Sequence, residues 1–283
     1  MTVANVVYRY CGYLSTSLLR ERTGQSPVRS LVIWRSRRTE RKDARADGGL
    51  RRQKEKGMNI VYSLTSNFVK KAEPSIKSVL EHNPKAKIYL LTDGEIESDI
   101  PMTIINVSGQ EYFTNQNCVN MKNNFGGYIN LLKVCYPELL KVNKVIHLDA
   151  DTIVTESLEP MWKTDLKGKW VAAVPEYRGQ YHPFGEMYFN MGVALINLQQ
   201  MRTDNIVPTM VEYLRSVRQP FVDQDAWNKY ALEQDKFVPL DIRWNENFAT
   251  GETDKPAIVH YCGRFDWYEN PSVHRHEYLE KYV

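Results

Sequence analysis

From Met58 onward, short apolar runs rich in β-branched residues alternate with segments of helical periodicity, and this alternation constrains the fold more than any other feature. The runs are continuously apolar, which is typical of strands buried on both faces of a parallel sheet. The pattern therefore predicts an α/β domain with a mostly parallel central sheet. We expect strands at 59–64, 87–92, 103–107, 144–148, 170–174, 192–198 and 257–261, and helices at 72–82, 129–140 (with a kink or restart at Pro137) and 205–217.

Residues 1–57 differ from the rest of the chain in charge. They hold 11 Arg and 3 Lys against five acids, a formal charge of +9, so the remainder carries −6 within the total of +3. The segment lacks clear periodicity, and we expect it to be disordered or to be a non-native extension in front of a natural start at Met58. A functional basic tail for an anionic membrane or nucleic acid, and an organelle transit peptide, are the alternatives. The single folded domain is then expected to cover residues 58–283.

Hydropathy and cysteine usage argue against several classes of protein. No apolar run approaches the ~20 residues that a membrane-spanning helix needs. The four cysteines form no C-x-x-C pair, which argues against a disulfide-rich fold and against a zinc site. We therefore expect a cytoplasmic protein without a transmembrane segment. Peripheral membrane association stays open, and nucleic-acid binding is not expected.

The stretch VIHLDADTIV, residues 145–154, places Asp149 and Asp151 at the end of a predicted buried strand. Repulsion and desolvation both disfavour such a pair unless a cation neutralises it. Ligands of α/β sheets bind at the carboxyl ends of strands, and Mg²⁺ or Mn²⁺ prefers oxygen ligands. The alternatives are a strand-end Asp followed by a turn or cap Asp, and the D-x-D-x-[TV] nucleophile motif of haloacid-dehalogenase phosphatases. That motif normally lies on the first strand and has Thr or Val where Ile153 stands here.

Several sequence blocks resemble those of glycosyltransferase family 8, the group that contains bacterial lipopolysaccharide galactosyltransferases and glycogenin. They are VYSLTSNF (61–68), LLKVCYPELL (131–140), the D-x-D with LEPMW after it (158–162), YFNMGVALINL (188–198), VDQDA (222–226) and HYCGRFDW (260–267). The resemblance covers nearly all of the chain after Met58. It implies a Rossmann-like GT-A fold, a UDP-sugar donor, Mn²⁺ with Mg²⁺ as an alternative, and retention of the anomeric configuration.

The resemblance also implies which residues contact the donor. Thr65, Asn67 and Phe68 would hold the uridine, with Phe68 either stacked on the base or serving as a core aromatic. Lys133, or Asn130 in another alignment, would reach the sugar or phosphate, unless Lys133 is a solvated surface residue. Further donor contacts are expected from Asp149, Ala150, Asp151, Asn190, Gly192, Asp223, Gly263 and Arg264.

The resemblance implies that Asp149, Asp151 and His260 bind Mn²⁺, the histidine through a neutral imidazole nitrogen. Asp223 and Gln224 are the expected catalytic residues. Asp223 would bind a hydroxyl of the donor sugar, unless it is only a helix N-cap. Gln224 is a poor nucleophile as an amide and would stabilise positive charge near the anomeric carbon.

Other positions are less determined or depart from the family pattern. Glu176 would lie in the acceptor pocket or on a surface loop, and residues 274–276 (HRH) are expected at a solvated end. Relatives read H-x-x-G-x-x-K-P-W near the C-terminus, whereas this chain lacks the Lys-Pro before Trp267, and Arg264 is the expected replacement. Many relatives also have Asp where Thr65 stands.

Together these features predict a retaining hexosyltransferase that moves glucose or galactose from a UDP-sugar to a hydroxyl of a glycan or other acceptor. A UDP-sugar-binding protein without transfer activity is the first alternative, because of the missing Lys-Pro. A metal-dependent phosphatase is the second.

Overall fold

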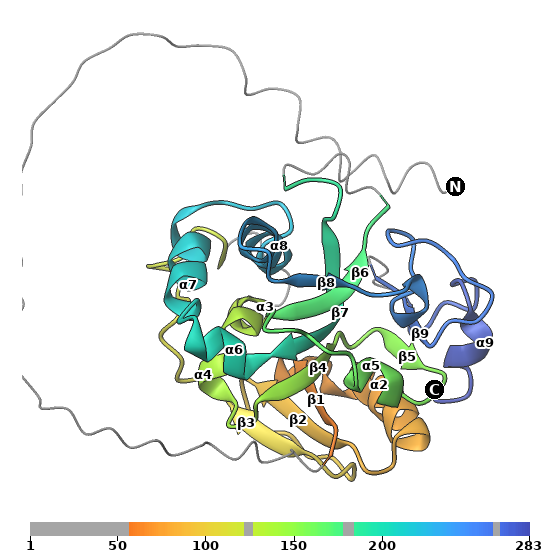
Figure 1. The fold of residues 1–283 in the computed structure, drawn as a ribbon. Coiled ribbons are helices and arrows are strands. Elements are labelled where there is room, and N and C mark those ends of the chain that lie inside the picture. The colour runs from red at the N-terminus through yellow and green to blue at the C-terminus, as the bar shows by residue number, and fades with distance from the viewer. Residues whose placement is uncertain (1–56, 122–126, 178–183, 263–266) are drawn as a thin grey trace, which may run out of the picture. The chain divides into compact units, whose positions relative to one another are not determined.

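The computed structural model describes residues 57–121, 127–177, 184–262 and 267–283 (Figure 1). The expectations for residues 1–56 therefore lie outside the described residues. The strands are β1 (Asn59–Ser63), β2 (Lys87–Thr92), β3 (Thr103–Asn106), β4 (Lys144–Leu148), β5 (Thr152–Val154), β6 (Val171–Pro175), β7 (Phe189–Asn197), β8 (Phe237–Pro239) and β9 (Ile258–His260). The helices are α2 (Val69–His82), α3 (Tyr128–Leu131), α4 (Tyr136–Leu139), α5 (Glu159–Trp162), α6 (Leu198–Thr203), α7 (Val207–Ser216), α8 (Asp223–Glu233) and α9 (His276–Leu279).

A seven-stranded sheet in the order β3-β2-β1-β4-β7-β6-β8 forms the centre of the domain. The pairs β3-β2, β2-β1, β1-β4 and β6-β8 are parallel, whereas β7 runs antiparallel to both β4 and β6. The predicted α/β class with a mostly parallel sheet is confirmed. The strands β5 and β9 lie outside this sheet and form a separate antiparallel pair.

Apolar layers cover both faces of the central sheet, which explains why its strands are continuously apolar in sequence. On β1, Ile60 and Tyr62 face a layer that includes α2 and α5, while Val61 faces a layer built from α3, α4, α6, α7 and α8 (Figure 1). The long strand β7 divides its side chains between the same two layers. This arrangement buries the strands, and because β7 is antiparallel to β4, the start of β7 lies at the edge where β1 and β4 end.

The helical segment expected at 129–140 is divided, and the restart expected at Pro137 is observed. The structure has α3, then a 3₁₀ turn at Leu132–Cys135, then α4 with Pro137 near its start. Proline has no backbone N–H and cannot continue an α-helical hydrogen-bond ladder from the preceding turn, so the helix restarts there. The 3₁₀ turn is the segment that carries Lys133.

Other elements were missed or were assigned with different bounds. β5, β8 and α8 were not expected as separate elements, because β5 and β8 have only three residues each and α8 has a weak apolar stripe. Strand β7 begins at Phe189, three residues before the predicted start at Gly192. Among the described residues, no helix combines the length and apolarity that crossing a bilayer would require.

Candidate active site

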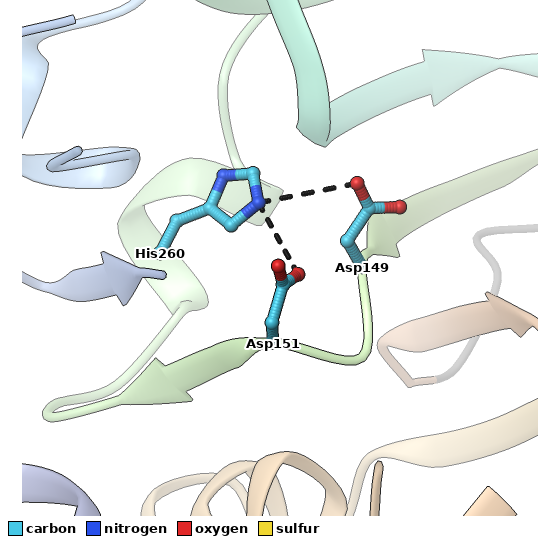
Figure 2. A group of neighbouring side chains, drawn as sticks. All are labelled: Asp149, Asp151 and His260. Carbon is cyan, nitrogen blue, oxygen red and sulfur yellow. Dashed lines mark ion pairs between the residues drawn. The ribbon is translucent and has the colours of Figure 1, made fainter. Parts of the chain in front are cut away.

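Asp149 and Asp151 come together with His260, which lies far from them in sequence (Figure 2). Asp149 follows the last residue of β4, and Asp151 lies in the short turn that leads into β5. Strand β5 pairs with β9 so that Thr152 lies opposite His260, and Tyr261 N–H donates to the Asp151 carbonyl at 2.8 Å. The small second sheet therefore positions the histidine beside the two carboxylates.

The ligand atoms of these three residues fit a single cation. His260 Nε2 lies 3.3 Å from Asp151 Oδ1 and 3.9 Å from Asp149 Oδ2, and one ligand atom from each residue lies within 4.8 Å of the others. Two carboxylates and one imidazole are a donor set suited to Mn²⁺ or Mg²⁺. Burial lowers the pKa of His260, but the facing carboxylates of Asp151 and Asp149 raise it above its usual value on balance.

Two neighbouring side chains bind the same carboxylate oxygen of Asp149, Oδ1. Lys133 Nζ donates to Asp149 Oδ1 at 2.8 Å, and His147 Nε2 lies 3.0 Å from the same oxygen. Burial raises the pKa of Asp149, but the positive charge of Lys133 and the hydrogen bond from His147 outweigh it and hold the pKa well below the usual range. The other oxygen, Oδ2, faces His260, so Asp149 is prepared to bind a cation through Oδ2.

His147 was missed as a functional residue, although it lies within the quoted strand. Its ring is buried, and burial lowers its pKa, so the imidazole is neutral. A carboxylate only accepts hydrogen bonds, so Nε2 carries the proton that is donated to Asp149. Tyr136 Oη, 3.0 Å from Nδ1, then donates to that nitrogen. The signal that could have found it is the spacing, because side chains two positions apart along a strand lie on the same face, as His147 and Asp149 do.

Gly192 lies against the candidate metal ligands. A Cβ at this position would lie 2.1 Å from His260 Cε1 and 2.9 Å from Asp149 Oδ2. The resemblance implied that Gly192 contacts the donor. The structure gives a different reason for glycine at this position, since the space beside the α-carbon is filled by the protein's own His260 ring.

Lys133 and Asp223 meet on the other side of Asp149. Lys133 is buried, so the surface-lysine alternative is wrong, and its Nζ lies 3.6 Å from Asp223 Oδ2. Burial lowers the pKa of Lys133, but Asp149 and Asp223 raise it well above the usual range. Burial raises the pKa of Asp223 to about 6, against the lowering effect of Lys133.

The start of α8 carries backbone strain next to the expected catalytic residues. Asp223 is the first residue of α8, and the N-cap is Val222, so the N-cap role for Asp223 is wrong. Val222 has φ 52°, an unfavourable value for a β-branched side chain. Such strain persists only where the surroundings impose it, and it is frequent at functional sites.

Gln224, Glu176 and Asn190 form a hydrogen-bonded group beside the metal ligands. Glu176 is buried, so its alternative placement on a surface loop is wrong. Its Oε1 accepts from Asn190 Nδ2 and from Gln224 Nε2, both at 3.0 Å. Gln224 Oε1 accepts from the Met191 backbone N–H at 3.0 Å. The amide of Gln224 is therefore held by the protein at both ends.

The residues expected to hold the nucleoside follow β1. Thr65 Oγ1 donates to Asn67 Oδ1 at 2.6 Å, and both belong to the turn that leads into α2. Phe68 is half-buried and packs on the core layer that contains α2, with Lys71 Nζ 5.6 Å from its ring centre. This turn and the D-x-D follow the neighbouring parallel strands β1 and β4, so they share one edge of the sheet.

Several expected residues play smaller parts or cannot be placed. Ala150 is buried between the two aspartates. Gly263 and Arg264 lie outside the described residues. Residues 274–276 are exposed or half-buried, as expected of a solvated end, but His274 and Arg275 also bind Glu246, whose side chain is fully buried.

A model of the family described as Glycosyl transferase family 8 matches residues 59–266. The chain belongs to glycosyltransferase family 8. Glycosyltransferase GlyA of Streptococcus pneumoniae is 26% identical over 221 residues, which is 71% of this chain and 31% of GlyA. General stress protein A of Bacillus subtilis is 29% identical over 182 residues, which is 53% of this chain and 62% of that protein. The chain thus spans between about one third and two thirds of the length of these two relatives.

Solved structures show the same fold. The galactosyltransferase LgtC in complex with donor and acceptor sugar analogs superimposes with a TM-score of 0.61 at 22% identity, covering 79% of this family 8 chain and 94% of LgtC. The bifunctional glycosyltransferase WbbM superimposes with a TM-score of 0.64 at 17% identity, covering 80% of this chain and 49% of WbbM. At these identities the likeness establishes the GT-A fold of the chain.

Proposed function

We propose that this family 8 chain is a retaining glycosyltransferase that moves a hexose, glucose or galactose, from a UDP-sugar to an acceptor hydroxyl. The observation that carries the proposal is the convergence of Asp149, Asp151 and His260 within reach of one cation, in a chain of this family. The proposed transferase domain covers residues 58–283. The similarity to the galactosyltransferase LgtC, whose structure was solved with donor and acceptor sugar analogs, supports a sugar donor and a sugar-like acceptor.

Asp149, Asp151 and His260 would hold Mn²⁺, with Mg²⁺ as the alternative. When bound, the ion supplies Lewis-acid neutralisation of the charge that develops on a departing diphosphate. The other proposed contacts to the donor come from side chains of the protein. Lys133 adds a buried positive charge beside Asp149, and the turn at Thr65, Asn67 and Phe68 is proposed to hold the uridine.

Asp223, Gln224 and Asn190 are proposed to act on the sugar. A carboxyl group with a pKa of about 6 is largely ionised near neutral pH, so Asp223 accepts a hydrogen bond from a sugar hydroxyl. Asn190 keeps one amide N–H beyond its bond to Glu176 and donates it to another hydroxyl.

Gln224 and Glu176 provide a polar surface for an oxocarbenium-like sugar. Both Gln224 amide ends are bonded to protein groups, which argues against a nucleophilic role and favours front-face attack by the acceptor with retention. Gly263 and Arg264 remain proposed contacts to the diphosphate. A cytoplasmic location is also part of the proposal, supported by the sparse cysteines.

A radiolabelled donor assay tests the function. UDP-glucose and UDP-galactose are each incubated with the protein, with and without Mn²⁺, and with a panel of mono- and disaccharide acceptors. We expect Mn²⁺-dependent transfer that Asp151→Asn abolishes and that the exposed control Asp254→Asn leaves unchanged. Thermal stabilisation by a UDP-sugar with Mn²⁺, but no turnover with any acceptor, would instead favour the binding-protein alternative suggested by the missing Lys-Pro. Release of phosphate irrespective of acceptor would refute the transferase assignment.

A further inference from the structure

The orientation of one buried amide can be deduced from a backbone group. The N–H of Gly192 can only donate, and it lies 3.0 Å from Asn190 Oδ1. This contact fixes which end of the Asn190 amide is oxygen. The same oxygen lies 2.9 Å from an amide end of Asn245, which must therefore be the donating Nδ2. Asn245 consequently turns its oxygen in the opposite direction, toward His260.

A second set of backbone donors gives the same orientation independently. Asn247 Oδ1 accepts from the N–H groups of Ala249 and Thr250 at 2.7 and 3.1 Å. Its Nδ2 then donates to Asn245 Oδ1 at 2.9 Å. Asn245 is thus held from both sides, and its side chain is fully buried.

The tautomer of the candidate metal-binding histidine follows from this geometry. His260 Nδ1 lies 2.9 Å from Asn245 Oδ1, an acceptor, so Nδ1 must carry a proton. In a neutral imidazole the lone pair then lies on Nε2, the nitrogen that faces Asp149 and Asp151.

We propose that Asn245 is a positioning residue that fixes His260 in the Nδ1–H tautomer, so that the Nε2 lone pair points at the cation site. Groups that bind the second nitrogen of a metal-binding histidine set its tautomer and ring orientation. This inference rests on the proposed metal site. No sequence block singled out Asn245.

The same amide connects the cation site to the sugar side. Asn245 Nδ2 holds Asn190, and Asn190 Nδ2 holds Glu176, which also binds Gln224. A substitution at position 245 therefore changes both the imidazole of His260 and the amide that is proposed to contact a sugar hydroxyl.

The first test observes the tautomer directly in metal-free protein. Long-range ¹H–¹⁵N spectra distinguish the two neutral imidazole forms, and the His260 signals are assigned by their loss in His260→Gln. At about pH 9, above the usual histidine pKa, we expect the Nδ1–H form in the unsubstituted chain. Finding the Nε2–H form there would overturn the inference without reference to any variant.

The second test compares variants at position 245. Asn245→Leu keeps similar volume but accepts no hydrogen bond, and we expect the Nδ1–H preference to be lost. Asn245→Asp still accepts from Nδ1–H and should retain that form. Mn²⁺ binding without nucleotide, measured by electron paramagnetic resonance, should weaken about 10- to 100-fold in Asn245→Leu. The control Asn120→Leu also removes a buried amide, one that bonds Leu214 and Val217, and should leave Mn²⁺ binding unchanged in its folded fraction.

The outcomes separate the two proposals. If the unsubstituted chain binds no Mn²⁺, the metal site of the proposed function fails, while the tautomer spectrum still tests Asn245. If the unsubstituted chain and folded Asn245→Leu bind Mn²⁺ equally, the metal site stands and the role of Asn245 is refuted.

Discussion

Substituting Gly192 by alanine should damage the cation site through contact with a single methyl group. The added Cβ would lie 2.1 Å from His260 Cε1, whereas ordinary contacts begin near 3.4 Å. The imidazole would therefore have to move by about 1.3 Å, or β7 would have to shift by a similar amount. Metal–ligand distances tolerate only about ±0.2 Å, so a displacement of this size removes His260 from the ligand set.

The expected cost has two parts. Loss of the imidazole ligand should weaken Mn²⁺ binding about 100-fold, which equals about 2.7 kcal/mol. Overpacking of the buried strand should also lower the free energy of unfolding by about 1–3 kcal/mol. The two parts are separable, because the first appears in a binding titration of folded protein and the second in urea denaturation without metal.

The assay is an electron paramagnetic resonance titration of Mn²⁺ into Gly192→Ala, with Gly109→Ala as the matched control. A Cβ at Gly109 meets no atom within 4 Å, so this control should bind Mn²⁺ as the unsubstituted chain does. Mn²⁺ affinity of folded Gly192→Ala within twofold of the unsubstituted chain would refute the reasoning, because it would mean that His260 either tolerates the shift or does not bind the ion.

Three further predictions concern charged side chains and their partners. Lys133→Met leaves Asp149 and Asp223 without the lysine ammonium group that they share. In urea denaturation this change should lower the free energy of unfolding by about 3–5 kcal/mol, and Mn²⁺ should restore part of the loss. A variant as stable as the unsubstituted chain would contradict the buried ion pair. Arg275→Ala removes a charged hydrogen bond to Glu246 and should lower the free energy of unfolding by about 1.5–3 kcal/mol. The double variant Glu246→Gln/Arg275→Ala should lose less than the sum of the two single changes. Additive losses would show that the two side chains do not stabilise each other. Burial raises the pKa of Asp204, but hydrogen bonds from Lys236, Trp170 and Gln200 lower it on balance. The ionised carboxylate therefore stabilises the folded state at pH values above the unfolded carboxyl pKa of about 4. This stabilisation is lost as the pH falls through the lower folded pKa. The stability deficit of Asp204→Asn at neutral pH should therefore shrink as the pH falls below the unfolded carboxyl pKa of about 4, and a deficit that is independent of pH would contradict this assignment.

Much of the fold could be predicted because burial leaves a direct mark on sequence. The strands β1, β2 and β4 are covered on both faces, and their continuous apolar runs indicated their positions. Short elements such as β5 and β8 gave no such mark, since three residues show no period. The direction of β7 was also hidden, because an apolar run does not reveal whether its neighbours are parallel or antiparallel.

The candidate site also has features that the sequence predicted and features that it did not. The chemical types of Asp149, Asp151 and His260, and the family to which their blocks belong, could be read from the sequence alone. The roles of Asn245 and Glu246 could not, because their partners are separated from them in sequence and are brought to them only by tertiary packing. His147 is different, because it lies only two residues before its partner Asp149. Sequence by itself determined which side chains are available to bind a cation and which segments must be buried. Tertiary structure decided which nitrogen of His260 faces the carboxylates and why position 192 has no side chain, because hydrogen-bond direction and steric exclusion depend on distances between segments that only folding brings together.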